Sequence, residues 1–188
     1  TPLFKRVAGR IVDWVLEVLA DTTQGAFFTS QDADVGLGDD GDYWTWTPAE
    51  LREALPDEAF QVAGRVFDVE AQGEMHHNPE KNVLWWASDP AGDEEWPILK
   101  DAMRKLKAVR DARRQPYVDI AAYVNWNAMM ASAFLHAGAV LDRPECNALA
   151  FKVLGRIWES WDEGRGMVHV IGRAQLHGLL DDNVHAAV

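Results

Sequence analysis

Carboxylates in two parts of this chain are the side chains best suited to acid and base chemistry. Asp32 and Asp34 flank one alanine, and Asp119, Asp181 and Asp182 lie far downstream. Glycoside hydrolysis needs two carboxyl groups facing each other across a sugar ring. Neighbours two apart in an extended strand lie too close for that, so we expect Asp32 or Asp34 to work with a distant carboxylate. Asp32, Asp34 and Asp119 are the predicted catalytic residues. The alternative, which turn chemistry favours, is that the first two only accept bonds from backbone amides.

Aromatic side chains supply candidate sugar-stacking surfaces, because the apolar face of a sugar ring packs well on a flat aromatic ring. Alternation along a strand would place Trp44 and Trp46 on one face and Tyr43 on the other, with one of the two sets in the core. Trp126 lies in a later, strongly apolar segment. Tyr43, Trp44, Trp46 and Trp126 are therefore predicted to bind substrate, and Trp85 and Trp86 are further candidates.

Three polar residues complete the predicted binding site. Asn127 follows Trp126 in an apolar helix, so its amide must be satisfied by a neighbouring backbone, by Asp119 or by a ligand. Asp182 lies one helical turn from His185 and can pair with it. His77, in the only dense histidine segment, is either an acid/base or a surface histidine.

Metal and cofactor chemistry finds little support in the sequence. His76 and His77 are adjacent in an extended segment and point to opposite sides, and no further His or Cys stands at zinc-ligand spacing. The acidic loop after Asp32 has Leu37 and Tyr43 where an EF-hand has Gly and Glu, which leaves only an irregular calcium site. Cys146 has no activating neighbours. We expect no metal and no cofactor.

Apolar spacing predicts helices joined by short strands. Residues 3–20 form a helix buried on more than one side, Thr47 and Glu50 make a capping box, and Asp57 caps a helix that runs through Phe67. Residues 95–114 carry a narrow apolar stripe typical of an outer helix. Residues 123–141 are apolar almost all round, typical of an inner helix, and the two are expected to pack antiparallel. Asp142 and Glu145 make a second capping-box pattern, and the total is about seven helices.

Residues 26–46 (AFFTSQDADVGLGDDGDYWTW) are expected to form one hairpin, with two aromatic strands around a Gly- and Asp-rich loop. Their order resembles the "GGFYSAEDADS…G.FYVWTPEE" segment of the thioredoxin-domain-containing spermatogenesis-associated proteins and their bacterial relatives. Residues 82–86 (NVLWW) resemble that family's "NVL" strand. Residues 113–119 (RRQPYVD) and 126–133 (WNAMMASA) resemble its "R.RP..DDK.LT.WN.LMI.A". Ile120 and Ala121 replace an Asp and a Lys of the family pattern.

This resemblance implies a mainly α fold, a six-hairpin glycosidase-like (α/α) toroid with short β-hairpins between its helices. The family carries a thioredoxin-like domain before the toroid. Because the sequence begins and ends in helical patterns, we expect residues 1–188 to be a fragment of one toroid domain, without that thioredoxin-like domain. The resemblance implies a carbohydrate-active domain, glycosidase-like or epimerase-like, with its ligand in the central funnel. The alternative is a non-catalytic module that binds a ligand or protein and is coupled to the thioredoxin-like domain.

Composition narrows the partners. The 188 residues are 48% apolar with nine tryptophans, enough for one good core. A formal net charge of −12 argues against nucleic acid and anionic membrane as partners. A single cysteine forms no internal disulfide, which fits the cytoplasm. A carbohydrate or other small molecule is the expected ligand, and incompletely covered helices should make the fragment self-associate.

Overall fold

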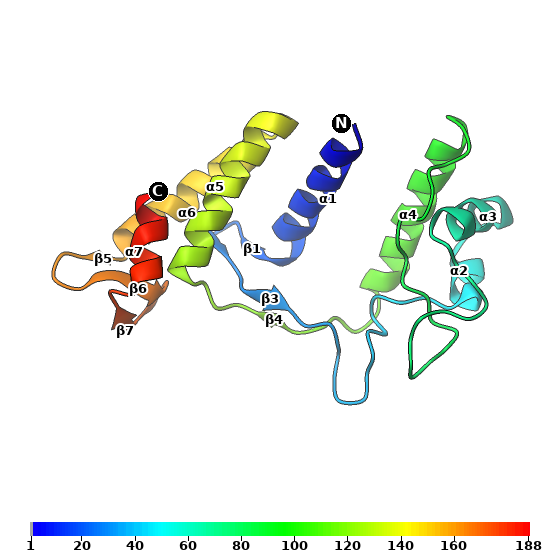
Figure 1. The fold of residues 1–188 in the computed structure, drawn as a ribbon, viewed down its shortest axis with the longest axis horizontal. Helices are drawn as coiled ribbons and strands as arrows, with labels where there is room; N and C mark the ends of the chain where they lie inside the picture. The colour runs from blue at the N-terminus through cyan, green and yellow to red at the C-terminus, as the bar shows by residue number, and fades with distance from the viewer. Residues whose placement is uncertain (1) are drawn as a thin grey trace. The chain divides into compact units, whose positions relative to one another are not determined.

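A computed structural model describes residues 2–188, apart from the side chains of Pro2 and Ala174. The protein is mainly α, with seven helices among the described residues, which agrees with the number expected. The sequence predicts one domain, and the structure groups the chain into two compact units. Residues 2–31 and 118–188 form unit 1, and residues 32–117 form unit 2. Figure 1 shows the elements of each.

Unit 1 is built on a helical hairpin. α5 (Val124–Leu141) and α6 (Pro144–Glu159) are joined by two residues and lie side by side (Figure 1). Asp142 adopts a left-handed conformation with φ 58°, which ends α5 and turns the chain back. A Cβ on Gly138 would lie 2.0 Å from Asn147 Oδ1, so the two helices approach closely because residue 138 has no side chain.

The remaining elements of unit 1 pack on this hairpin. α1 (Pro2–Val18) and α7 (Leu180–Ala187) both contact α5. β1 (Ala20–Asp21) pairs with β2 (Ala26–Phe27), and β3 (Ser30–Gln31) pairs with β4 (Val118–Asp119). β5 (Trp161–Asp162), β6 (Gly166–Val170) and β7 (Arg173–His177) form a three-stranded antiparallel sheet. The core joins Val12 and Val15 of α1 with Phe134, Val153 and Ile157.

Unit 2 packs three helices around a second core. α2 (Pro48–Ala54), α3 (Asp57–Val66) and α4 (Glu95–Asp111) bury Leu51, Val66 and Leu99 together with Trp46. The predicted capping box is confirmed: Glu50 N donates to Thr47 Oγ1 at 3.1 Å, and Thr47 N donates to Glu50 Oε2 at 2.7 Å. The narrow buried stripe of α4 is also confirmed, with Leu99, Ala102 and Leu106 inside.

Several local expectations are wrong. α1 is not buried on more than one side, because Leu3, Val7 and Ile11 are exposed. Pro56, not Asp57, occupies the N-cap of α3, which ends at Val66. Asp142 does not cap α6, because it closes α5 in the left-handed conformation and Pro144 begins the next helix. Glu145 instead accepts a 2.7 Å bond from Arg143.

The helices expected over residues 95–114 and 123–141 belong to different units, and each packs against another helix of its own unit. The main partner of α4 is α3, and that of α5 is α6, because a two-residue connection folds α6 directly back onto α5. Phe134 of α5 is buried as expected for an inner helix, but Trp126, Met129 and Val140 are exposed. α5 is therefore covered on one side rather than all round.

The single hairpin expected over residues 26–46 does not form. β2 and β3 each pair with another strand, and Trp46 forms an isolated bridge with Asn82. Residues 42–44 form a turn instead of a strand, because the carbonyl of Gly41 accepts bonds from the amides of Trp44 and Thr45.

Candidate functional site

The carboxylates of the acidic loop lie on the surface of unit 2. Asp34 is exposed, and its Oδ1 accepts a 3.0 Å bond from the Gly41 amide. The pKa of Asp39 is held below its usual range by bonds from the backbone amides of Val35 and Asp42. Asp32 is exposed, and its own amide donates to the Tyr117 carbonyl at 2.8 Å. Asp34 therefore has the structural role that turn chemistry favours, bonding a loop amide.

Asp119 belongs to unit 1, at the end of β4. Its Oδ1 accepts a 2.9 Å bond from the Ala121 amide, which shapes the connection toward α5. Among the described residues, the side chains of Asp119 and Asn127 hydrogen-bond to other groups and not to each other. The predicted contact between them is therefore wrong.

The predicted substrate-binding aromatic residues of unit 2 are mostly buried inside it. Tyr43 and Trp46 are both buried, so the expected alternation of faces is wrong, because the segment is a turn. Trp44 is partly buried and packs edge-on against Tyr43. Arg113 holds this turn: its Nη1 donates to the carbonyls of residues 42, 43 and 45, and its guanidinium lies 4.1 Å from the Trp46 ring centroid.

His77 is a surface residue of unit 2, with a side chain 72% exposed. Its Nδ1 lies 3.1 Å from Asp40 Oδ2, and this bond holds the pKa of the Asp40 carboxyl below its usual range. No cluster of three or more His, Cys, Asp or Glu side chains that could hold a metal ion occurs among the described residues. Burial raises the pKa of the Cys146 thiol, which keeps it protonated and a poor nucleophile.

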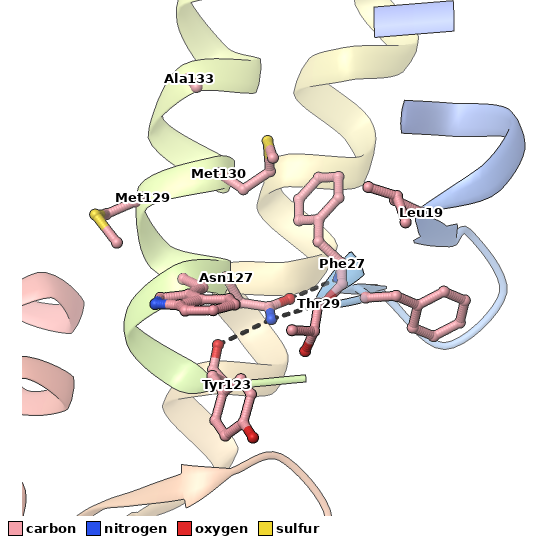
Figure 2. A pocket seen from close by; sticks show the side chains of 10 residues that line it. Leu19, Phe27, Thr29, Tyr123, Asn127, Met129, Met130 and Ala133 are labelled. Atoms are coloured by element: carbon pink, nitrogen blue, oxygen red, sulfur yellow. Dashed lines mark hydrogen bonds between the residues drawn. The ribbon is translucent and has the colours of Figure 1, made fainter. Parts of the chain in front are cut away.

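Asn127 is 1% exposed, and its amide is satisfied by backbone. Oδ1 accepts a 2.6 Å bond from the Phe27 amide, and Nδ2 donates to the carbonyls of Phe27 and Tyr123 at 2.9 Å each. Figure 2 shows these bonds as dashed lines. Of the three partners expected from the sequence, a neighbouring backbone, Asp119 or a ligand, the structure places the first against this side chain.

Asn127 and Phe27 both line a cleft of unit 1 that has a volume of about 430 Å³. Tyr123, Asn127 and Met130 lie along the start of α5, and Leu19 and Phe27 lie opposite (Figure 2). The full lining consists of apolar and aromatic side chains with few polar groups: Leu19, Phe27, Phe28, Thr29, Tyr123, Trp126, Asn127, Met129, Met130 and Ala133. This volume falls in the usual range of small-molecule pockets, roughly 300–1,000 Å³.

Trp126 and Tyr123 form the aromatic part of the cleft. Trp126 is 49% exposed, and its ring packs against that of Tyr123 at a centroid separation of 5.3 Å. No described residue hydrogen-bonds to the indole N–H of Trp126 or to the hydroxyl of Tyr123. Both polar groups are therefore available to a ligand lying on the rings.

A His–Asp pair adjoins the Tyr123 side of the cleft. His169 lies with its ring centroid 4.9 Å from that of Tyr123, and its Nδ1 is 2.9 Å from Asp182 Oδ2. Asp182 is 0% exposed and also accepts a 3.2 Å bond from the Asn125 amide through Oδ1. The expected pairing of Asp182 with His185 is wrong, because both carboxylate oxygens are engaged elsewhere. Asp182 is therefore shielded by burial, whereas the His169 side chain is 26% exposed.

Backbone pairing positions His169 and Asp182, which we call the dyad. Tyr123 forms an isolated bridge with Val170, and the Ile171 amide donates to the Ala122 carbonyl at 2.9 Å. β6, which carries His169, is thereby fixed beside the first turn of α5. Asp182 comes from the first turn of α7. The Asn125 amide lies in the first helical turn, where backbone donors lack partners within the helix, so Asp182 also caps α5.

Tyr123 and His169 are not among the site residues predicted from the sequence. His169 lies 13 positions from Asp182 with a β-turn and a strand between them, so no helical or strand spacing connects the two. No protein-family model matches the chain, and no curated protein matches it.

Proposed function

We propose that unit 1 binds a carbohydrate in the cleft lined by Tyr123 and Trp126, as part of a carbohydrate-active six-hairpin toroid related to the spermatogenesis-associated thioredoxin-domain family. The observation that carries the proposal is that the exposed ring of Trp126 and the partly buried ring of Tyr123 lie in one concave site, with polar groups that no described residue hydrogen-bonds. The mainly α fold and the α5–α6 hairpin support the same family.

A sugar fits this site by its two kinds of surface. Its C–H face packs on a flat aromatic ring, and its hydroxyls meet the Trp126 indole N–H and the Tyr123 hydroxyl. The apolar remainder of the lining disfavours a highly charged ligand, since burying an unpaired charge is costly. Asp119, which belongs to the same unit as the cleft, stays a predicted catalytic carboxylate. The proposed ligand is an uncharged sugar in the cytoplasm, and nucleic acid and membrane are not proposed partners.

The methionines provide a direct test, because two of the five line the cleft and three do not. In protein labelled with ¹³C at the methionine methyls, p-nitrophenyl glycosides and free hexoses titrated to millimolar concentration should shift Met129 and Met130. The methyl signals of Met75, Met103 and Met167 should not shift. Shifts spread evenly over all five, or none with any sugar, would contradict sugar binding in the cleft.

Matched tryptophan variants sharpen the result. Trp126→Ala should abolish the shifts of the cleft methionines because it removes the stacking surface. Trp158→Ala removes an exposed tryptophan of α6 that does not line the cleft, and should leave the titration unchanged. Equal effects of the two variants would count against the site.

The second candidate function is a non-catalytic module that binds a ligand or another protein. Binding of a protein is favoured by α1, where Leu3, Val7, Ile11 and Trp14 form an exposed apolar row. Sugar binding without any turnover would favour this candidate over a carbohydrate-active one.

Among the described residues, no helix is long and apolar enough to span a membrane.

A further inference from the structure

We propose that His169 is a general base, acting through Nε2 on a hydroxyl of a ligand held against Tyr123, and that Asp182 is the positioning residue that directs it. This inference rests on the proposed sugar binding in the neighbouring cleft. Three observations support the assignment of His169 as a base: the geometry of the dyad, the burial of its carboxylate and the contact between the His169 and Tyr123 rings.

The hydrogen bond to Asp182 determines which nitrogen is basic. A carboxylate only accepts, so a neutral His169 bonds Asp182 Oδ2 with its proton on Nδ1. The lone pair is then on Nε2, for which the described residues provide no partner. The His169 side chain is 26% exposed, so Nε2 is accessible to a small molecule. The pair thus has the arrangement in which a buried Asp orients a catalytic His.

The proposed step moves one proton from the ligand to His169. An O–H bond of the ligand breaks, an Nε2–H bond forms, and the electron pair remains on the ligand oxygen. The positive charge of the resulting imidazolium faces the Asp182 carboxylate, which favours the transfer. Asp182 itself keeps its bond from the Asn125 amide throughout and takes no proton.

Two conservative variants separate this role from a structural one. Asp182→Asn keeps the acceptor for the Asn125 amide and gains an amide N–H that donates to Nδ1, which moves the His169 proton to Nε2 and removes the basic lone pair. His169→Asn keeps an N–H able to bond Asp182 but has no base. Thermal melting checks that each variant folds.

The experiment uses the 188-residue chain and two readouts that need no known substrate. Long-range ¹H–¹⁵N spectra should show the Nδ1–H tautomer of His169 in the wild type and the Nε2–H tautomer in Asp182→Asn. Diethyl pyrocarbonate, followed by mass spectrometry, should modify His169 at least tenfold more slowly in Asp182→Asn. His136, an exposed histidine of α5, should react equally in both and serves as the control.

The ligand experiment distinguishes the two proposals. A sugar that shifts Met129 should also slow the modification of His169 but not that of His136. If the sugar shifts Met129 and leaves His169 unprotected, or if Asp182→Asn leaves the tautomer and reactivity unchanged, the base assignment is overturned while sugar binding stands. If no sugar shifts the cleft methionines, sugar binding fails first, and the base assignment, which depends on it, fails with it.

Discussion

The side chain of Asn127 brackets the backbone of Phe27, 100 residues earlier in the chain, accepting from its amide at 2.6 Å and donating to its carbonyl at 2.9 Å. A side-chain amide thus replaces a strand neighbour for β2. Because the same amide also bonds the Tyr123 carbonyl, it joins both walls of the cleft.

Asn127→Leu should lower the free energy of unfolding by about 1–3 kcal/mol, because it leaves the buried amide and carbonyl of Phe27 without partners. Urea unfolding measures the change. Ser132→Leu introduces the same side chain at an exposed position of α5 and should change stability far less. Equal losses in the two variants would mean that the bonds of Asn127 contribute little.

Gly138→Ala should destabilise the α5–α6 hairpin by about 1–3 kcal/mol, because the new Cβ meets Asn147 Oδ1. Asn147→Ala should be nearly neutral alone, since that oxygen is buried without a described partner. The double variant should recover most of the loss, a non-additivity that thermal melting of all four proteins detects. Strict additivity would show that the two residues do not collide.

The exposed row on α1 should make the chain self-associate, because contiguous apolar patches of several hundred Å² usually find cover. Light scattering should show a mass that rises with concentration in the wild type. Val7→Glu combined with Ile11→Glu, one helical turn apart, should suppress this rise. Leu37→Glu, at a fully exposed loop position of unit 2, is the control and should not. A monomeric wild type over a wide concentration range would refute the prediction.

Unit 2 should lose stability in acid partly through Glu50. Burial alone would raise the pKa of this carboxyl, but bonds from Thr47 and Lys81 and the charge of Arg113 outweigh it, so the folded-state pKa is lowered. The stabilisation is therefore present above the unfolded-state pKa and is lost as the pH falls through the folded-state value. Melting temperatures measured from about pH 6 to pH 3 should depend less steeply on pH in Glu50→Gln. Identical slopes would contradict the assignment.

Two local patterns in the sequence predicted local structure correctly. The capping box of Thr47 and Glu50 needs only residues three apart, and the buried stripe of α4 follows from helical periodicity. Asp142 and Glu145 show the limit of the same rule. Their spacing satisfies the pattern, but a proline between them takes the first helical position and the turn closes the preceding helix instead.

The site depends on contacts between residues far apart in the chain, which helical or strand spacing does not predict. Asn127 was singled out as a polar residue in an apolar helix, yet its partner Phe27 could not be named, since the pairing arises only when β2 reaches α5. His169 meets Asp182 only because a β-turn and a strand bring α7 behind β6. Trp126 is exposed although its helix was expected to be covered all round, and Tyr43 and Trp46 are buried because their segment forms a turn rather than an extended strand.

The cleft also has a consequence for the order of folding. One wall comes from residues 19–29, the other from residues 123–133, and the dyad beside it from residues 169 and 182. Contacts between such distant segments form slowly, because loop closure must precede the stabilising contact. The local α5–α6 hairpin should therefore form early in refolding, whereas protection of the Phe27 amide from hydrogen exchange should arise late.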